Sequence, residues 1–259
     1  MAEPAYGHDF FSRIDPSAQL SAQRVLPLLV EALEPDSIAD VGCGSGVWLA
    51  EAARLGIDDY LGVDGYTPAE SLRIPEERFL LHDLAVPLRL DRQFDLVMCL
   101  EVGEHLPPEA GDVLVETLVG LGPAVLFSAA VPNQSGEHHL NEQWPHYWAE
   151  RFQRHGLVAV DGIRPRIWND EGVAWWYRQN VLLFCRPDAI ERSQALREAR
   201  AATRDGQLAV VHPILYSWMV HQRDVLAEEV ARSPSLREVL DMIPPAASNA
   251  VKHRVRRRA

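Results

Sequence analysis

The sequence has few cysteines and no long apolar run. Its three cysteines include no Cys-x-x-Cys pair, and Cys43, Cys99 and Cys185 lie in or beside apolar segments. We therefore expect buried free thiols in a reducing compartment. No apolar run approaches the roughly 20 residues that span a bilayer, and the first 20 residues lack the basic start and apolar core of a secretory signal. The sequence predicts a cytoplasmic protein with no membrane association.

Basic residues are also scarce. The 259 residues include 25 Lys and Arg against 37 Asp and Glu, which gives a formal net charge of -12. This balance argues against a phosphate-reading surface over most of the protein, so a nucleic-acid partner is not expected. The last nine residues depart from it, since VKHRVRRRA contains Lys252, Arg254 and Arg256–Arg258. Such a tail could contact nucleic acid or an acidic partner, although a solvated terminus is the favoured interpretation.

Short apolar segments at regular spacing predict strands, with helix-like segments between them. This alternation is typical of a parallel sheet covered by helices on both faces. A helical segment at about 17–33 precedes the first strand. The expected strands are 37–41, 60–63, 78–81, 94–100 and 124–129, and the expected helices between them include 47–55 and 111–121.

The pattern changes after residue 144. One more helix is expected to end at Gly156, and segments 157–168 and 176–187 then resemble two strands without a helix between them. This predicts an antiparallel hairpin at the sheet edge. Beyond Pro187 the chain is rich in Ala, Arg and Glu, which favours helices. The expected fold is therefore α/β, a Rossmann-like three-layer sandwich whose mostly parallel sheet has an antiparallel edge hairpin, plus C-terminal helices.

Three parts are expected along the chain. Residues 1–36 form an N-terminal helical cap or lid, in which Tyr6, Phe10 and Phe11 could pack over a ligand. Residues 37–187 form the α/β domain, and residues 188–259 form a helical appendage with the basic tail.

Three glycines, Gly42, Gly44 and Gly46, stand at alternate positions between the first expected strand and the following helix. Glycine there permits positive φ and close approach of a ligand to the backbone, and the N–H groups that open a helix attract negative charge. A dinucleotide site prefers Gly-x-Gly-x-x-Gly, which requires glycine where this chain has Val47. The spacing predicts a ligand-binding turn and disfavours a nicotinamide or flavin dinucleotide.

Four motifs in order resemble the class I S-adenosylmethionine-dependent methyltransferases. Their first motif is an acidic residue followed by Gly-x-Gly-x-Gly, which here begins at Asp40. YLGVDGY then ends the second strand with Asp64, RFLLHDL ends the third with Asp83, and FDLVMCLE ends the fourth with Glu101. Four elements over residues 37–108 are far more specific than a glycine loop alone.

The resemblance implies S-adenosylmethionine as cofactor and S-adenosylhomocysteine as product. It implies that Asp64 binds the ribose hydroxyls and that Asp83 contacts the adenine amino group. Asp40 is expected to hold the glycine loop or the methionine ammonium. The expected cofactor-binding residues are Asp40, Gly42, Cys43, Gly44, Gly46, Asp64, Gly65, Asp83, Leu84, Leu100 and Glu101.

Three histidines are candidates for the catalytic base, since histidine titrates near neutral pH. His138 and His139 lie in the loop after the fifth strand, and His139 is preferred. His105 follows the fourth strand, and a structural or cofactor-side role is favoured for it. Glu101, Glu104 and His105 also raise the possibility of a metal site, because ubiquinone-pathway O-methyltransferases, which this stretch resembles, have been described with metal at such a motif. A loop-stabilising role is favoured, so no metal is expected.

Aromatic residues gather between residues 144 and 177. We expect Trp144, Tyr147, Trp168 and Trp175 to shape the acceptor side. Aromatic walls favour an aromatic, heterocyclic or sugar-like small molecule, with an oxygen acceptor ahead of a nitrogen one. A homodimer is compatible with this reading.

Four alternatives remain open at this point. One is another reaction of the same cofactor, by a non-methylating transferase or a cyclase. A second is an RNA or protein methyltransferase recruited through the basic tail, and a third is a binding protein without catalysis. Dinucleotide oxidoreduction comes last because of Val47.

Overall fold

The structure is a computed structural model that describes residues 8–232, with side chains from residue 13 onward. Tyr6, the side chains of Phe10 and Phe11, and the basic tail at 251–259 therefore lie outside the described residues. The chain divides into two compact units, Met1–His212 and Pro213–Ala259. The first unit contains the sheet and all of the candidate site residues. The described part of the second unit is the helix α9, Pro213–Arg232.

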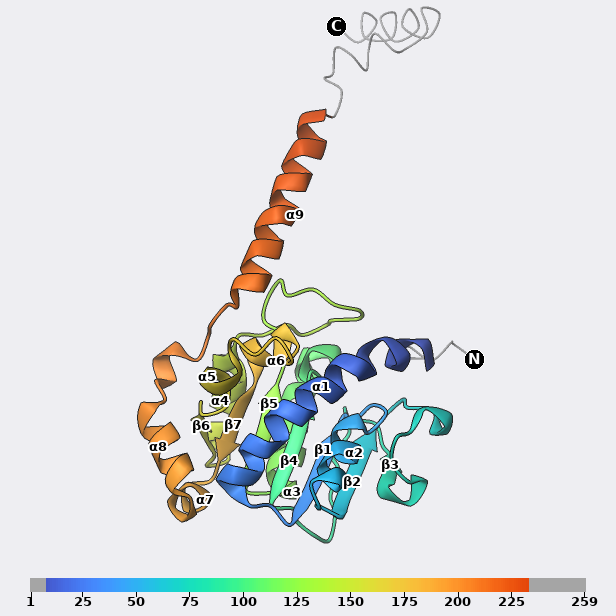
Figure 1. Cartoon of the computed structure of the whole chain (residues 1–259), viewed down its shortest axis with the longest axis vertical. Helices are drawn as coiled ribbons and strands as arrows, with labels where there is room; N and C mark the ends of the chain where they lie inside the picture. The colour runs from blue at the N-terminus through green and yellow to red at the C-terminus, as the bar shows by residue number, and fades with distance from the viewer. Residues whose placement is uncertain (1–7, 233–259) are drawn as a thin grey trace, which may run out of the picture. The chain divides into compact units, whose positions relative to one another are not determined.

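Within the described residues, seven strands form one sheet in the order β3-β2-β1-β4-β5-β7-β6 (Figure 1). The first five strands are parallel, and β7 runs antiparallel to both β5 and β6. This confirms the expected mostly parallel sheet with an antiparallel edge. The strands are β1 Ser37–Val41, β2 Asp59–Asp64, β3 Phe79–Leu81, β4 Leu96–Leu100, β5 Ala124–Ser128, β6 Val158–Val160 and β7 Leu182–Cys185.

The chain reverses its direction of travel across the sheet between β1 and β4. Ala39 of β1 pairs with Leu61 of β2 on one side and with Val97 of β4 on the other. Ligands of open α/β sheets bind outside the carboxyl ends of the strands at such a switch point. All residues of β1, β4 and β5 are buried, as expected for parallel strands that are covered on both faces.

Helices cover both faces of the sheet. In the first unit they are α1 His8–Leu33, α2 Val47–Arg54, α3 Gly111–Leu121, α4 Pro145–Arg154, α5 Arg164–Ile167, α6 Trp175–Asn180, α7 Pro187–Arg192 and α8 Gln194–Ala202. Single turns of 3-10 helix are η1 Ala69–Ser71, η2 Glu76–Arg78, η3 Gly103–His105, η4 Pro108–Ala110 and η5 Asp205–Gln207.

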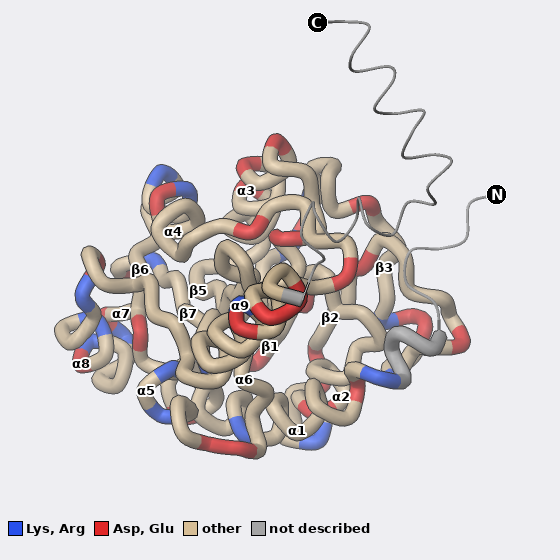
Figure 2. Tube along the Cα trace, turned by 90° about the horizontal axis from the view of Figure 1, so that it is seen from above, with Lys and Arg blue, Asp and Glu red and all other residues tan. Residues whose placement is uncertain are grey.

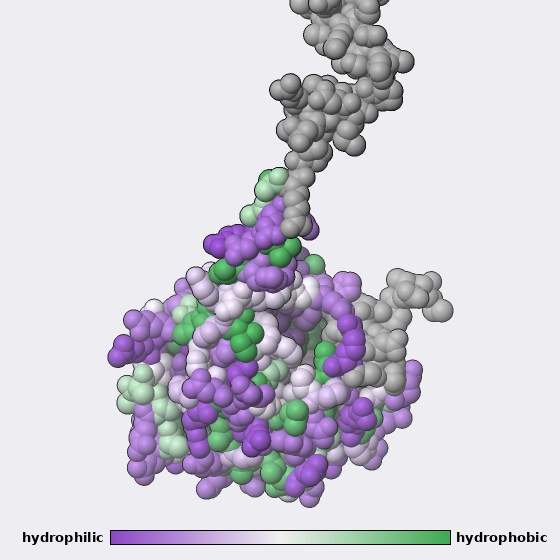
Figure 3. Space-filling model, turned by 45° about the horizontal axis from the view of Figure 1, so that its top comes forward, coloured by the Kyte–Doolittle hydropathy of each residue, from purple (hydrophilic) through white to green (hydrophobic). Residues whose placement is uncertain are grey.

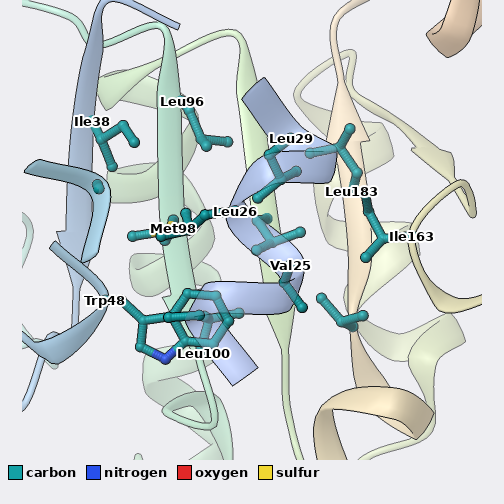
Figure 4. Close-up of a cluster of buried hydrophobic side chains, with 14 of the residues drawn as sticks. Val25, Leu26, Leu29, Ile38, Trp48, Leu96, Met98, Leu100, Ile163 and Leu183 are labelled. Carbon is teal, nitrogen blue, oxygen red and sulfur yellow. The ribbon is translucent and has the colours of Figure 1, made fainter. Parts of the chain in front are cut away.

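Alternate residues of each strand point into two separate cores. On one face, Leu26 and Leu29 of α1 pack toward Met98 of β4, as Figure 4 shows. On the other face, Phe152 of α4 stacks on Phe184 of β7 with ring centroids 4.1 Å apart. The two cores make this a three-layer sandwich. The surface of the sheet-containing unit mixes hydrophilic and hydrophobic residues on the face seen in Figure 3.

The edge hairpin differs from the expected one. The sequence predicts strands over 157–168 and 176–187, but β6 has three residues and β7 has four, and α5 and α6 lie between them. Pro165 occupies the first turn of α5, where its missing N–H has no cost. The N–H of Ala174, just before α6, donates to Ser21 Oγ of α1. These contacts favour helical turns over a long ribbon.

The first unit also extends further than expected. Ile190 of α7 and Leu196 of α8 are buried in the same core as α1, so the unit ends after His212 rather than after Pro187. The helices expected beyond Pro187 are present, but two of them belong to the sheet-containing unit. No described helix is both long enough and apolar enough to cross a membrane.

Candidate active site

The carboxyl ends of the parallel strands meet at the upper edge of the sheet in Figure 1. The glycine loop follows β1, Asp64 ends β2, and Glu101 follows β4 at this edge. The helix α6 lies there too, since β7 is antiparallel and its first residue, Leu182, pairs with Phe127 near the end of β5. The fold therefore gathers the cofactor motifs and α6 at one edge.

All three loop glycines have positive φ: 84° at Gly42, 52° at Gly44 and 79° at Gly46. The N–H groups of Gly42 and Cys43 both donate to the carbonyl of Val63, at 2.7 and 3.1 Å. A Cβ on Gly42 would lie 2.2 Å from Cγ2 of Val102. The glycine loop thus touches the segment after β4, and only glycine allows this approach.

A buried carboxylate of α1 fixes the glycine loop from the other side. Asp15 accepts from Ser45 Oγ at 2.8 Å and from Arg73 Nε at 3.2 Å, and the N–H of Arg73 donates to the carbonyl of Ser45 at 2.7 Å. Sequence reasoning missed Asp15, because a single carboxylate inside a helical segment carries no local signal.

Asp64 links the glycine loop to the end of β2. Its Oδ2 accepts from the N–H of Gly44 at 2.9 Å, and its Oδ1 accepts from the N–H groups of Tyr66 and Thr67 at 2.9 and 3.2 Å. A carboxylate has about four acceptor positions, so Oδ2 keeps one position for a further donor. Gly65 follows directly, and a Cβ on it would meet the carbonyl of His82 at 3.4 Å.

Asp83 and Leu84 are the residues expected to contact the adenine, and Asp83 is more exposed than Asp64. Asp83 is exposed, and its Oδ1 accepts from the N–H of Ala85 at 2.9 Å in a local turn. Leu84 is partly buried against the second core.

Asp40 is a buried carboxyl in the middle of this edge. Burial and, second, the nearby charge of Asp64 raise its pKa to about 8. Among the described residues, none donates a hydrogen bond to this carboxyl. A buried acid without a donor is stabilised by a cationic ligand, so Asp40 and Asp64 fit a sulfonium and ammonium compound that also carries ribose hydroxyls.

Glu101 lies beyond β4 with a φ of 55°. Its carboxylate accepts from Asn180 Nδ2 at 3.1 Å and from Gln134 Nε2 at 3.3 Å. Gln179 Nε2 joins the network through Gln134 Oε1 at 3.1 Å and through Asn180 Oδ1 at 2.9 Å. Burial raises the pKa of Glu101, and the hydrogen bond from Asn180 is the largest opposing effect. Leu100, just before it, is 8% exposed.

Gln134, Gln179 and Asn180 were missed from the sequence. The signal that could have found the last two is a polar pair placed directly before an apolar strand, in RQNVLLFC.

Glu104 is fully buried beside Glu101. Its Oε1 accepts from the N–H of Ala130 at 3.1 Å, and Oε2 has no hydrogen-bond partner within the described part of the chain. Burial and then the charge of Glu101 raise the pKa of Glu104 well above its usual range. Burial thus favours the protonated form of both carboxyls, whereas the hydrogen bonds from Asn180 and Gln134 oppose this effect at Glu101.

His139 forms a dyad with Glu142. Its Nδ1 lies 2.8 Å from Glu142 Oε1, and the same carboxylate accepts from the N–H groups of Asn133 and Ser135 at 2.7 and 2.8 Å. Glu142 thus shapes the loop after β5 and orients the imidazole, so that Nε2 is the acceptor nitrogen. Glu142 was not identified from the sequence.

The other two candidate histidines differ in their surroundings. The ring of His105 meets the ring of His139 edge to face, with centroids 4.9 Å apart. Burial and then the charge of His139 lower the pKa of His105 to about 4, so this ring is neutral at physiological pH. His138 is exposed and has a φ of 59°.

Three potential metal ligands come together among the described residues. Ligand atoms of Glu104, His105 and His139 all lie within 4.8 Å of one another. The set differs from the one considered in the sequence, since His139 takes the place of Glu101.

The four candidate acceptor-side aromatics come from three segments. Trp144 is 43% exposed and precedes α4. Tyr147 donates from its hydroxyl to the carbonyl of Pro108 at 3.2 Å and carries the guanidinium of Arg151 on its ring. Trp168 packs on His212, and Trp175 opens α6 with its ring against Trp176. Of these, Trp175 shares an element with Asn180 of the Glu101 network.

Comparisons with known proteins agree with the fold. A family model described as a methyltransferase domain matches residues 14–164. The solved structure of Streptomyces venezuelae DesVI superposes with a TM-score of 0.53 at 14% identity, covering 69% of this chain and 96% of that chain. At this identity, the likeness shows only that the two proteins share a fold.

Two curated proteins are similar in sequence. Ubiquinone biosynthesis O-methyltransferase of Acinetobacter baylyi is 34% identical over 101 residues, which is 35% of this chain and 42% of that protein. Ribosomal protein L11 methyltransferase of Geobacter sulfurreducens is 29% identical over 152 residues, 55% of this chain and 46% of that protein. The chain thus spans less than half the length of these relatives.

The fold and the strand-end motifs define a Rossmann-like α/β protein whose candidate ligand site lies at the β1–β4 switch point. Because the family model matches more than half of its length, the chain belongs to the family described as a methyltransferase domain.

Gly42→Ala is expected to lower the free energy of unfolding by about 2–4 kcal/mol, because alanine would be strained at a φ of 84° and would clash with Val102. Urea unfolding measures the change. Gly120→Ala in α3 is the control, since its surroundings are open and alanine favours helix by up to about 1 kcal/mol. A Gly42→Ala protein as stable as the original would contradict the close approach.

Asp40 makes ligand binding depend on pH. With a pKa of about 8, its carboxyl is mainly protonated at pH 7, and a cation beside it favours the ionised form. Binding of S-adenosylmethionine is therefore expected to release more protons in the original protein than in Asp40→Asn, and its affinity to rise between pH 6 and 8. Calorimetry at pH 7 in buffers of different ionisation enthalpy measures this release.

In the ligand-free protein, the contribution of Asp40 to folding stability changes with pH in the opposite direction to ligand affinity. The folded state holds the Asp40 proton more tightly than the unfolded chain, whose reference pKa is 3.8, so this contribution to stability falls as pH rises from about 4 to 8. If binding of S-adenosylmethionine releases as many protons from Asp40→Asn as from the original protein, Asp40 does not take part in binding.

Proposed function

We propose that this protein transfers a methyl group from S-adenosylmethionine to an oxygen atom of a small-molecule acceptor. The observation that carries the proposal is the His139–Glu142 dyad, which lies on the loop after β5 beside the strand ends that hold Asp40, Asp64 and Glu101. An oxygen acceptor needs a base in this position, whereas a neutral amine does not.

The residues of the strand edge would hold the cofactor, which supplies an electrophilic methyl group on a sulfonium when bound. Asp64 would accept from the ribose hydroxyls through its remaining Oδ2 position. The charge of Asp40 would balance the positive end of the methionine part, near Glu101. The glycine loop permits close approach of the ligand, and Asp83 with Leu84 would lie at the adenine.

On the acceptor side, Nε2 of His139 would accept the hydroxyl proton of the acceptor. Glu142 keeps the other nitrogen protonated and stabilises the imidazolium that forms. His105 stays neutral because of its low pKa, so it adds no competing positive charge. The Glu101 network, anchored by Asn180 and Gln134, would keep the methyl end rigid.

Aromatic residues around the site favour an acceptor with aromatic, heterocyclic or sugar character. The Acinetobacter relative is named as an O-methyltransferase of ubiquinone biosynthesis, which supports oxygen over nitrogen. The Geobacter relative is named as a methyltransferase of a ribosomal protein. A protein acceptor is therefore the alternative, and the basic tail is the segment that would recruit it.

Binding of S-adenosylmethionine and S-adenosylhomocysteine, but not of NAD, is expected in calorimetric titrations. Asp64→Ala should weaken both by about 10–100-fold, because one charge-assisted hydrogen bond is lost and the glycine loop loses its anchor at Gly44. Asp58→Ala is the control, since Asp58 is exposed at the opposite end of β2. Binding of NAD alone, or an unchanged affinity in Asp64→Ala, would reject the assignment.

His139→Ala is expected to lower kcat by about 10²–10⁴-fold with little change in cofactor affinity, because the proton acceptor is removed. Glu142→Gln should have a smaller effect in the same direction. Product analysis on phenols, sugars and amines identifies the acceptor and measures both variants. His155→Ala, a change at an exposed helix end, is the matched control.

Two further results separate this role from others. Added imidazole should partly restore turnover to His139→Ala, since it can replace the missing base. EDTA should leave the original protein active, because the proposed proton transfer to His139 uses no metal. Loss of turnover on chelation would assign His139 to a metal with Glu104 and His105.

A further inference from the structure

One buried cation at this edge has no counter-ion. Arg178 is 7% exposed, and its Nε is shielded from solvent without a hydrogen-bond partner in the described part of the chain. Among residues 13–232, no carboxylate pairs with its guanidinium. Arginine is almost never buried unless it is paired, and an unpaired buried charge destabilises a protein. The position therefore needs an explanation beyond the fold.

A second buried arginine shows what a structural role looks like in this chain. Arg164 is 2% exposed. Its Nε donates to Asp161 Oδ1 at 2.9 Å, and its Nη1 donates to the carbonyls of Leu208 and Gln179 at 2.8 and 3.2 Å. Its donors are thus used inside the protein, whereas those of Arg178 remain available to a ligand.

Arg178 belongs to the short helix α6, whose residues on either side of it in the chain contact two parts of the site. Tyr177 packs edge to face on Trp48 of α2, just after the glycine loop, with centroids 5.3 Å apart. Asn180 hydrogen-bonds Glu101. Within the described residues, no hydrogen bond or ion pair joins Arg178 to Glu101.

Trp175 lies three residues before Arg178 and therefore on the same face of α6. This face presents an aromatic ring and a cation together. Elsewhere the edge is acidic, and Figure 2 shows basic residues mainly along α4, α5, α7 and α8, on the β6 side of the sheet. A positive group on α6, the element that supplies Asn180 to the Glu101 network, would favour a ligand with the opposite charge.

We propose that Arg178 binds an oxyanion, a carboxylate or a phosphate, on the acceptor, and so makes the protein specific for acidic small molecules. A guanidinium matches the geometry of either group through two parallel hydrogen bonds. Trp175 would cover the ring or sugar that carries the anion. This inference rests on the proposed function, because it assigns the acceptor to the same site.

Binding of model acids to the full chain tests the proposal. The probes are benzoate and phenyl phosphate, each with a neutral partner, benzamide and phenol, and tryptophan fluorescence or calorimetry reports binding. Each acid is expected to bind at least tenfold more tightly than its neutral partner. Arg178→Gln should abolish that preference, and Arg192→Gln on the exposed face of α7 should retain it. The preferred acid identifies the anion.

A stability measurement gives an independent readout. Arg178→Met is expected to raise the Tm of the ligand-free protein by about 2–5 °C, because an unpaired buried charge is removed. Arg164→Met should lower it, since Asp161 and two carbonyls lose their donor. A lower Tm for Arg178→Met would show that the side chain serves the fold, and the proposal would fail.

Other results would also overturn it. Acids that bind no better than their neutral partners, or a preference that survives in Arg178→Gln, would remove the subsite. A tenfold loss of S-adenosylhomocysteine affinity in Arg178→Gln would assign the cation to the cofactor carboxylate instead. The acid titrations need no cofactor, so absence of S-adenosylmethionine binding rejects the proposed function separately.

Discussion

The acceptor side of the site depends on the partly buried carboxylate of Glu101. A carboxylate in a low-dielectric interior is stable only when hydrogen bonds satisfy it, and here the donors come from two distant segments, Gln134 after β5 and Asn180 of α6. To deliver Asn180, the chain must form α6 at the carboxyl edge before it enters β7. This requirement accounts for the short edge strands, because residues of a long hairpin could not reach Glu101.

Electrostatic repulsion is the second constraint on this edge. The charge of Asp64 raises the pKa of Asp40, and the charge of Glu101 raises the pKa of Glu104, so each pair favours a proton on its more buried member. Asp64 accepts hydrogen bonds from three backbone N–H groups. A positively charged ligand lowers the free energy of ionising the buried Asp40. The site therefore favours cationic ligands over neutral ones. Arg178 of α6 would instead favour an anionic group on the ligand.

The sequence predicts the cofactor half of the site better than the acceptor half. The glycine loop, Asp64 and Glu101 each follow a short buried strand, and parallel topology brings strand ends together without further information. Asp15, Gln134 and Asn180 act through contacts between segments 30 to 79 residues apart, which leave no local pattern. The segment at 176–180 was misassigned as a strand because its aromatic residues favour strands, whereas its contacts with α1 and Glu101 select a helix.

This division explains why family membership says little about the acceptor. The matched region ends at residue 164, so it contains the glycine loop, Asp64, Glu101 and the His139–Glu142 dyad, but not α6. The helix that supplies Gln179, Asn180 and Arg178 lies beyond it, inserted between β6 and β7. The cofactor motifs lie outside this helix, which contacts the rest of the unit through Glu101, Gln134 and Trp48 among others. Specificity in this protein is therefore expected to reside in α6, the element that sequence periodicity assigned to the wrong class.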